Sequence, residues 1–241
     1  GFPNQKSSKK ILKAMIDGGI DAVEIGYPYS DPVMDGPVIQ AAADQSLANG
    51  TGAKEVFELL AHSVELGAPS LVMSYWSPIE KYGVAKFAQA IATAGGSGVI
   101  TPDLTIEESD GWIAATKKAG INPIYVVAPS TKDERLKSVT AKTGGFVYAA
   151  SMMGVTGTRS TVASSASELV ARVRTVTDLP ISVGLGVSTR EQAKSLAAYA
   201  DGVIVGSAFI KLLLDAPSEQ EGLDAISHLA KELALGVREG R

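Results

Sequence analysis

Cysteine is absent from this 241-residue sequence, and histidine occurs only twice, as His62 and His228. The lack of cysteine excludes disulfides, thiolate nucleophiles and cysteine-bound metals, and it suits the reducing cytoplasm, where we expect the chain to work. Both histidines fall inside helical patterns, away from the ends of predicted strands, so we expect no metal site. No apolar run approaches the ~18 residues that suggest a membrane-spanning helix, and we expect no membrane partner.

Concentrated positive charge is lacking as well. The net charge is -4, and the longest basic runs are the pairs Lys9-Lys10 and Lys117-Lys118 on predicted helix faces, so we expect no nucleic-acid partner. No lysine lies at the C-terminal end of a predicted strand, which argues against a Schiff-base aldolase. No Gly-x-Gly-x-x-Gly follows a strand, so no dinucleotide fingerprint is present. We therefore expect a chain that binds neither metal nor cofactor.

Short apolar segments alternate with segments of helical spacing along the chain. The apolar segments are rich in Val and Ile and lack polar alternation, which is typical of parallel strands buried on both faces. They are Asp21–Gly26, Ser70–Tyr75, Gly98–Thr101, Pro123–Ala128, Gly145–Ala150, Pro180–Gly184 and Asp201–Gly206. Helical spacing occurs in Ser7–Gly18, Val56–Val64, Phe87–Ile91, from Ile113 onward, and in Leu169–Val176, Ala193–Leu196 and Leu223–Leu233.

This alternation predicts an α/β fold with a parallel sheet. The chain length is close to the ~250 residues of one (β/α)8 TIM barrel, and nothing marks a boundary, so we predict a single domain over residues 1–241. Seven strands are visible where a closed barrel needs eight. We expect the first strand to be missing from this chain and to lie before Gly1; an open seven-stranded sheet is the alternative.

Two carboxylates near the second strand are candidate functional groups. The active site of such a barrel lies at the C-terminal ends of its strands. Glu24 lies inside the apolar strand, where burial should raise its pKa toward the value that a general acid/base needs near pH 7. A buried glutamate bonded to neighbouring backbone or hydroxyl groups is the alternative. Asp35 follows eleven residues later in a turn-rich loop, where a helix N-cap or Asx-turn is the alternative; the same applies more strongly to Asp31.

Glycines after the last two strands indicate a phosphate site. Gly184-Leu185-Gly186 follows one strand and Gly206-Ser207 follows the next, and each precedes a helical segment. Backbone amides next to helix N-termini bind anions, and the loops at these two places are the usual phosphate site of TIM barrels. Together, the two segments favour a phosphorylated small molecule as substrate, although either alone is equally typical of a tight turn.

A long loop follows the strand that holds Tyr148, whose hydroxyl needs a partner if it faces the barrel interior. The loop runs from Met153 through Thr156 and Gly157 into a Ser/Thr-rich stretch. Long loops in compact barrels often act as lids, and a simple mobile connection is the alternative. The residues alone thus predict a barrel that handles a small phosphate ester with one or two carboxylates.

Four segments resemble the signature of tryptophan synthase alpha subunits. They are Val23–Pro37, Tyr148–Gly157, Gly184–Val187 and Asp201–Ser207, within a resemblance that runs from Gly1 to about Gly236. The resemblance implies cleavage of indole-3-glycerol phosphate into indole and glyceraldehyde 3-phosphate without a cofactor. It assigns the general acid/base to Glu24 and the carboxylate that holds the indole N–H to Asp35.

The resemblance also implies roles for further residues. Tyr148 would lie beside the catalytic glutamate, and Thr156 would be a lid residue that meets the aspartate. The phosphate cradle would consist of Gly157, Gly184, Gly186, Gly206 and Ser207. The apolar indole slot would consist of Ile100, Val126, Leu185 and Ile204, for which barrel core is the alternative.

Family members work with a partner, a beta subunit that carries pyridoxal phosphate, and this implies an alpha2beta2 tetramer. The loop from Tyr29 to Pro32, with Asp31, would touch that subunit. Tyr27 stands where the family usually has a small aliphatic residue, and Ser77 stands where it usually has Asn. The alternatives are a stand-alone indole-3-glycerol phosphate lyase, another sugar-phosphate barrel, and a non-catalytic barrel that only activates a beta subunit.

Overall fold

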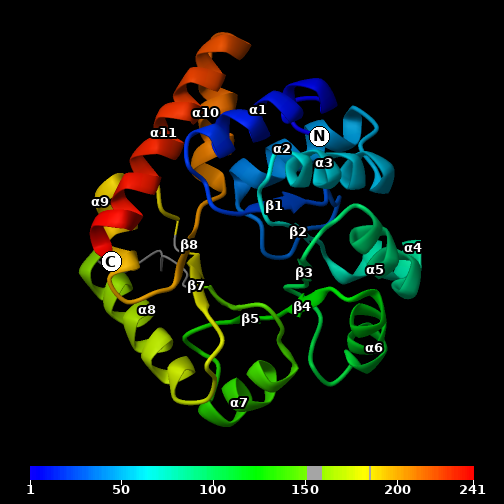
Figure 1. Cartoon of the computed structure of the whole chain (residues 1–241), viewed down its shortest axis with the longest axis vertical. Coiled ribbons are helices and arrows are strands. Elements are labelled where there is room, and N and C mark those ends of the chain that lie inside the picture. Colours follow the sequence, from blue (N-terminus) through cyan, green and yellow to red (C-terminus); the bar gives the residue numbers. More distant parts are fainter. Residues whose placement is uncertain (151–158, 185) are drawn as a thin grey trace.

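Helices surround a set of parallel strands in the computed structural model, which describes residues 1–150, 159–184 and 186–241 without the side chains of residues 159–164 (Figure 1). The strands are β1 (Val23–Gly26), β2 (Ser70–Met73), β3 (Gly98–Ile100), β4 (Asn122–Ile124), β5 (Val126–Val127), β6 (Val147–Ala150), β7 (Ile181–Gly184) and β8 (Gly202–Ile204). The helices are α1 (Gln5–Asp17), α2 (Pro37–Ala48), α3 (Ala53–Glu65), α4 (Trp76–Tyr82), α5 (Val84–Thr93), α6 (Asp110–Ala119), α7 (Asp133–Lys142), α8 (Arg159–Arg174), α9 (Arg190–Ala197), α10 (Ser207–Asp215) and α11 (Glu219–Gly240).

The strands form two parallel four-stranded sheets in sequence order, β1 to β4 and β5 to β8. Only Tyr125 separates β4 from β5, so these two segments together correspond to the predicted strand Pro123–Ala128. All seven predicted strands, and the α/β barrel arrangement, are confirmed. Within the described part of the chain β1 pairs only with β2 and β8 only with β7, which leaves the barrel wall open between β1 and β8. The location of a further strand before Gly1 stays a prediction.

Alternate side chains of each strand face opposite sides of the barrel wall. Outward-facing residues such as Val72 and Val99 are completely buried beneath the helices in the main core. The inward-facing side chains form a second apolar cluster, made of Leu71, Ile100 and Ile124 with Met73, Val126, Phe146 and Tyr148 packed against it. Apolar residues are therefore needed on both faces, and this is why the strands lack polar alternation.

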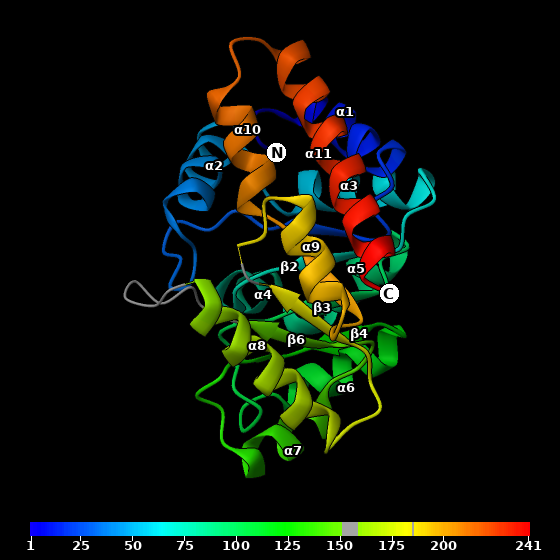
Figure 2. The same ribbon diagram turned by 90° about the vertical axis from the view of Figure 1, so that its left-hand side faces the viewer.

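The helices that sequence spacing predicted are all present, and α9 and α11 lie side by side on the outside of the barrel (Figure 2). Three further helices, α2, α4 and α7, were not predicted. The alanine-rich α2 buries only Ala42 and Ser46, and the seven-residue α4 buries only Ile79, so neither presents the broad apolar stripe that marks a helix in a sequence. No helix of the described residues is long and apolar enough to cross a membrane.

Candidate active site

Glu24 lies in the middle of β1 and faces the barrel interior. It is in register with Leu71 of β2, which belongs to the inner apolar cluster. Its side chain keeps partial contact with water, but the surrounding protein atoms desolvate it and raise the pKa of its carboxyl from 4.5 to about 7. Such a group is close to half protonated at neutral pH and can both donate and accept a proton.

Tyr148 of β6 faces the same interior. Burial and the negative charge of Glu24 both raise the pKa of its phenol, so the two side chains lie within electrostatic reach of each other. Gly184 at the end of β7 makes room for this ring, because a Cβ atom there would lie 2.7 Å from the Tyr148 hydroxyl oxygen. The structure thus brings Glu24, Tyr148 and Gly184 together; the family resemblance implies Tyr148 beside the glutamate, whereas it assigns Gly184 to the phosphate cradle.

Asp35 lies on the loop between β1 and α2, with its side chain beside Tyr75. Burial raises the pKa of the Asp35 carboxyl, and its interaction with the Tyr75 hydroxyl partly offsets this rise. The backbone N–H of Met34 donates a hydrogen bond to the same hydroxyl at 3.1 Å. The N-cap of α2 is Gly36, so the alternative interpretation of Asp35 as that helix's N-cap is wrong.

Tyr75 was not identified as a functional candidate from the sequence. It lies two residues after the end of β2, at the C-terminal edge of the barrel where functional side chains of this fold gather. The apolar pattern of the sequence predicts Tyr75 as the last residue of a strand. Its position at a strand end was the signal that could have identified it.

The two glycine segments lie next to each other. Strands β7 and β8 are hydrogen-bonded neighbours with Gly184 opposite Ile204, so the loops that follow them share one edge. Gly186 has a φ of 65°, a conformation that favours glycine, and Gly206 is the N-cap of α10. Among the described residues no side-chain hydrogen bond caps the N-terminus of α10, and both Gly206 and Ser207 are exposed. Free amides at such a helix start suit an anion.

The residues predicted to line the indole slot have different surroundings. Ile100 is fully enclosed in the inner cluster, whereas Val126 and Ile204 are half-buried. In this structure Ile100 is therefore part of the barrel core, and its contact with a ligand stays a prediction. Thr156, Gly157 and Leu185 lie outside the described residues.

The loop predicted to touch a partner exposes apolar surface. Asp31 is exposed and its carboxylate accepts a hydrogen bond from the Ser30 hydroxyl at 2.6 Å, while Pro32 is half-buried. Val33 and Met34 follow, with 76% and 51% of their surface exposed. Large apolar side chains this exposed are typical of a surface that another protein covers.

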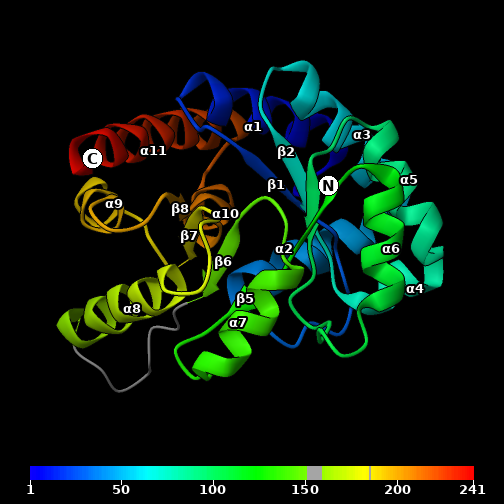
Figure 3. The same cartoon turned by 60° about the horizontal axis from the view of Figure 1, so that its bottom comes forward.

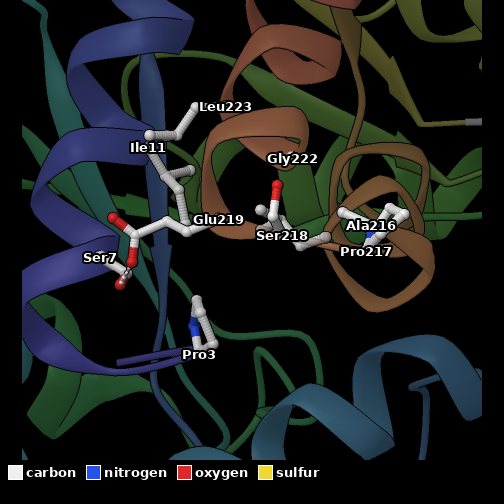
Figure 4. Close-up of a pocket in the computed structure, with 10 residues that line it drawn as sticks. Pro3, Ser7, Ile11, Ala216, Pro217, Ser218, Glu219, Gly222 and Leu223 are labelled. Atoms are coloured by element: carbon white, nitrogen blue, oxygen red, sulfur yellow. Dashed lines mark hydrogen bonds between the residues drawn. The ribbon is translucent and has the colours of Figure 1, made fainter.

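A cavity of about 270 Å³ lies away from these residues, between α1, α10 and α11 (Figure 4). Ile11, Leu213 and Leu223 supply much of its apolar lining. Its carboxylate, Glu219, is already paired, since it accepts a hydrogen bond from Ser7 at 2.8 Å and binds Lys10. Figure 3 shows α1 and α11 crossing on one side of the barrel, well away from α7.

The described residues include no cluster of His, Asp and Glu that could hold a metal ion.

A family model described as "Tryptophan synthase alpha chain" matches residues 1–237. The chain belongs to the tryptophan synthase alpha chain family. It is 55% identical to the tryptophan synthase alpha chain of Thermobifida fusca, over 99% of this chain and 89% of that protein. It is 53% identical to the corresponding chain of Streptomyces avermitilis, over 100% of this chain and 87% of that protein.

Solved structures of the family agree with the fold. A crystal structure of Mycobacterium tuberculosis tryptophan synthase, in an aminoacrylate- and BRD0059-bound form, matches with a TM-score of 0.89 and 42% identity, over 98% of this chain and 88% of that one. The tryptophan synthase alpha chain of Legionella pneumophila matches with a TM-score of 0.88 and 30% identity, over 99% and 88%. The resemblance drawn from the motifs is confirmed, and an unrelated sugar-phosphate barrel or an open sheet is excluded.

Proposed function

We propose that this chain catalyses the retro-aldol cleavage of indole-3-glycerol phosphate into indole and glyceraldehyde 3-phosphate, a lyase step of tryptophan biosynthesis. One observation carries the proposal above all. Glu24 holds a carboxyl group with a pKa of about 7 in the barrel interior, beside Tyr148. Cleavage needs a group that both donates and accepts a proton at neutral pH.

The proton balance of the reaction requires only one such group. Protonation of indole carbon 3 makes an iminium ion, and removal of the proton from the adjacent side-chain hydroxyl lets the carbon–carbon bond break. The electrons of that bond return to the ring and neutralise the iminium nitrogen, while the hydroxyl carbon becomes the aldehyde. Glu24 gives one proton and takes one, so it ends as it began.

Asp35 would bind the indole N–H and stabilise the positive charge that develops on that nitrogen. Backbone amides from two places would hold the phosphate. Gly184 and Gly186 contribute from the end of β7 and the loop after it, and Gly206 and Ser207 contribute from the start of α10. The Asp35 carboxylate and these backbone amides would act by position and charge alone. The proposed reaction therefore needs no cofactor on this chain.

The proposed partner is a tryptophan synthase beta subunit, the enzyme that uses pyridoxal phosphate, in an alpha2beta2 tetramer. Two features support this. The Mycobacterium tuberculosis structure that matches this chain is named tryptophan synthase as a whole. The loop that holds Asp31 and Pro32 continues into the exposed side chains of Val33 and Met34, next to Asp35. A subunit docked on this loop would order the loop and thereby raise activity.

Indole release from indole-3-glycerol phosphate tests the proposal, with the purified chain measured alone and with a beta subunit from a close relative. We expect slow release that rises strongly when beta is added. In Glu24→Gln, release should fall by about 10²-fold or more, the size of a general acid/base contribution, while binding of the non-cleavable indole-3-propanol phosphate survives. Near-normal turnover of this variant would remove Glu24 from the mechanism.

The remaining outcomes distinguish the alternatives. Fast release without any effect of beta would identify a stand-alone lyase. No release, from a folded chain that nevertheless activates the beta subunit, would identify a non-catalytic activator and overturn the proposed reaction.

A further inference from the structure

We propose that Tyr75 is a positioning residue for Asp35. The Tyr75 hydroxyl fixes the Asp35 carboxylate and fastens the loop that holds Asp35 to the end of β2. The inference rests on the proposed function, because it concerns the carboxylate that would bind the indole N–H. It adds a residue that the family motifs around Glu24 and Asp35 do not contain.

A tyrosine hydroxyl has one hydrogen to donate and lone pairs that accept. At Tyr75 the oxygen accepts the backbone N–H of Met34 at 3.1 Å. Its hydrogen is left for the neighbouring Asp35 carboxylate, with which the hydroxyl also interacts. One hydroxyl therefore holds two consecutive residues of the loop, one by the backbone and one by the side chain.

Tyr75 itself is rigidly held. Only 5% of its surface is exposed, and its ring packs against that of Tyr29 with the centroids 5.4 Å apart. It is also the N-cap of α4, and the next residue, Trp76, donates its backbone N–H to both carboxylate oxygens of Asp103 at 2.9 and 3.1 Å. The hydroxyl is thus a fixed point, supported from the loop after β3.

On the loop side of this contact, the Gln40 side chain donates a hydrogen bond to the backbone carbonyl of Asp35 at 2.8 Å, which holds the backbone and not the carboxylate. Val33 and Met34, the residues just before Asp35, are among the most exposed apolar side chains of the described residues. Without the Tyr75 hydroxyl the carboxylate would have to be ordered when the substrate binds, and the ordering entropy would oppose binding and catalysis. A fixed carboxylate avoids this loss.

The hydroxyl also favours the charged form of Asp35. Burial raises the pKa of that carboxyl, and the Tyr75 hydroxyl is the group that lowers it. Burial raises the pKa of the Tyr75 phenol, and the nearby carboxylates of Asp35 and Asp103 raise it further, so the hydroxyl stays protonated as a donor. Loss of the hydroxyl should therefore move the protonation of Asp35 to higher pH.

The test is Tyr75→Phe, which keeps the buried ring and removes only the hydroxyl. Indole release is measured with the beta subunit present, from pH 5.5 to 9. We expect kcat/KM to fall about 10-fold, the size of a lost hydrogen bond to a charged group. Because Glu24 also titrates in this range, the protonation of Asp35 is followed through the affinity for indole-3-propanol phosphate in a Glu24→Gln background, where Tyr75→Phe should move the change in affinity to higher pH. Tyr82→Phe is the matched control: its ring is 41% exposed and packs on Phe57 and Phe87, and activity should not change.

A double-mutant cycle separates positioning from general damage. In an Asp35→Asn background, Tyr75→Phe should cost little more, whether the readout is turnover or the affinity for indole-3-propanol phosphate. Equal losses in both backgrounds, or an unmoved pH dependence of analogue binding, would overturn the inference. If wild type itself releases no indole, the proposed function fails instead, and the two failures are therefore distinguishable.

Discussion

Glu24 links the stability of the fold to its proposed chemistry. A carboxyl group with a folded-state pKa of about 7, against 4.5 for the free group, prefers the protonated form in the folded protein. The contribution of this preference to the free energy of unfolding is fully present below pH 4.5 and is lost as the pH rises to about 7. At pH 8 the folded protein therefore carries the cost of a desolvated charge.

For this reason the free energy of unfolding of Glu24→Gln at pH 8 should exceed that of wild type by at most about 3 kcal/mol. The variant should therefore unfold at a higher urea concentration. At pH 4.5 the difference should nearly disappear, because the glutamate is then neutral in the folded state. Urea denaturation of both proteins at the two pH values measures the effect. The exposed Glu108→Gln, which changes the same chemical group, should show little difference; equal effects from both variants would contradict a role for burial.

At the scale of elements, the packing of α11 against α9 depends on a close approach of two backbones. Gly236 of α11 is buried, and a Cβ atom there would clash with the carbonyl oxygen of Arg190 at the start of α9. Arg190 also binds Glu232 and Glu239 of α11, so polar contacts flank the same crossing. The pair covers the outside of the barrel next to β8, to which α9 leads.

Gly236→Ala should therefore destabilise the protein by roughly 1–3 kcal/mol, the range for overpacking, although alanine is the better helix former. Gly111 in α6 provides the opposite case. Nothing lies within 4 Å of its Cβ position, and Gly111→Ala should be neutral or stabilise by up to about 1 kcal/mol. Thermal or urea unfolding of the two variants compares them directly. A stabilising Gly236→Ala would show that α9 and α11 are less tightly packed than the structure indicates.

At the scale of the whole molecule, the strands differ in the number of neighbouring strands with which they are hydrogen-bonded. Those in the middle of each sheet, such as β3 and β6, have hydrogen-bonded neighbours on both sides. Across the described residues β1 and β8 each have a single strand partner, and β8 is only half-buried along its length. Edge strands with unpaired backbone groups open more readily than central ones. Glu24, the proposed catalytic acid/base, lies on β1, and β8 leads into Gly206 and Ser207 of the proposed phosphate site.

Amide hydrogen exchange of the 241-residue chain should show this difference. Averaged over each strand, β1 and β8 should exchange at least about 10-fold faster than β3 and β6. Exchange followed by mass spectrometry or NMR at neutral pH gives the measurement. Equal protection in all four strands would mean that the edges are covered. The single-domain organisation, which would make the central strands open together, stays a prediction.

Much of the fold was predictable because it depends on local pattern. Val- and Ile-rich runs and helical spacing identified all seven strands and most helices, since burial on both faces leaves a mark on each segment by itself. The narrow buried faces of α2, α4 and α7 leave no such mark. Glu24 was recognisable as a candidate for the same local reason: a carboxyl group within an apolar strand is costly unless it is paired or neutral, so its presence there marks a possible site.

The sequence alone therefore determined the class of fold, the family, the two carboxylates and the glycine segments, because each is carried by residues close together in the chain. The tertiary structure decided what depends on residues that are far apart in the chain. It placed Tyr148 against Gly184, enclosed Ile100 in the core, and set the Tyr75 hydroxyl between Met34 and Asp35. Contacts of this kind follow from the crossing of strands and loops, and no local pattern encodes them.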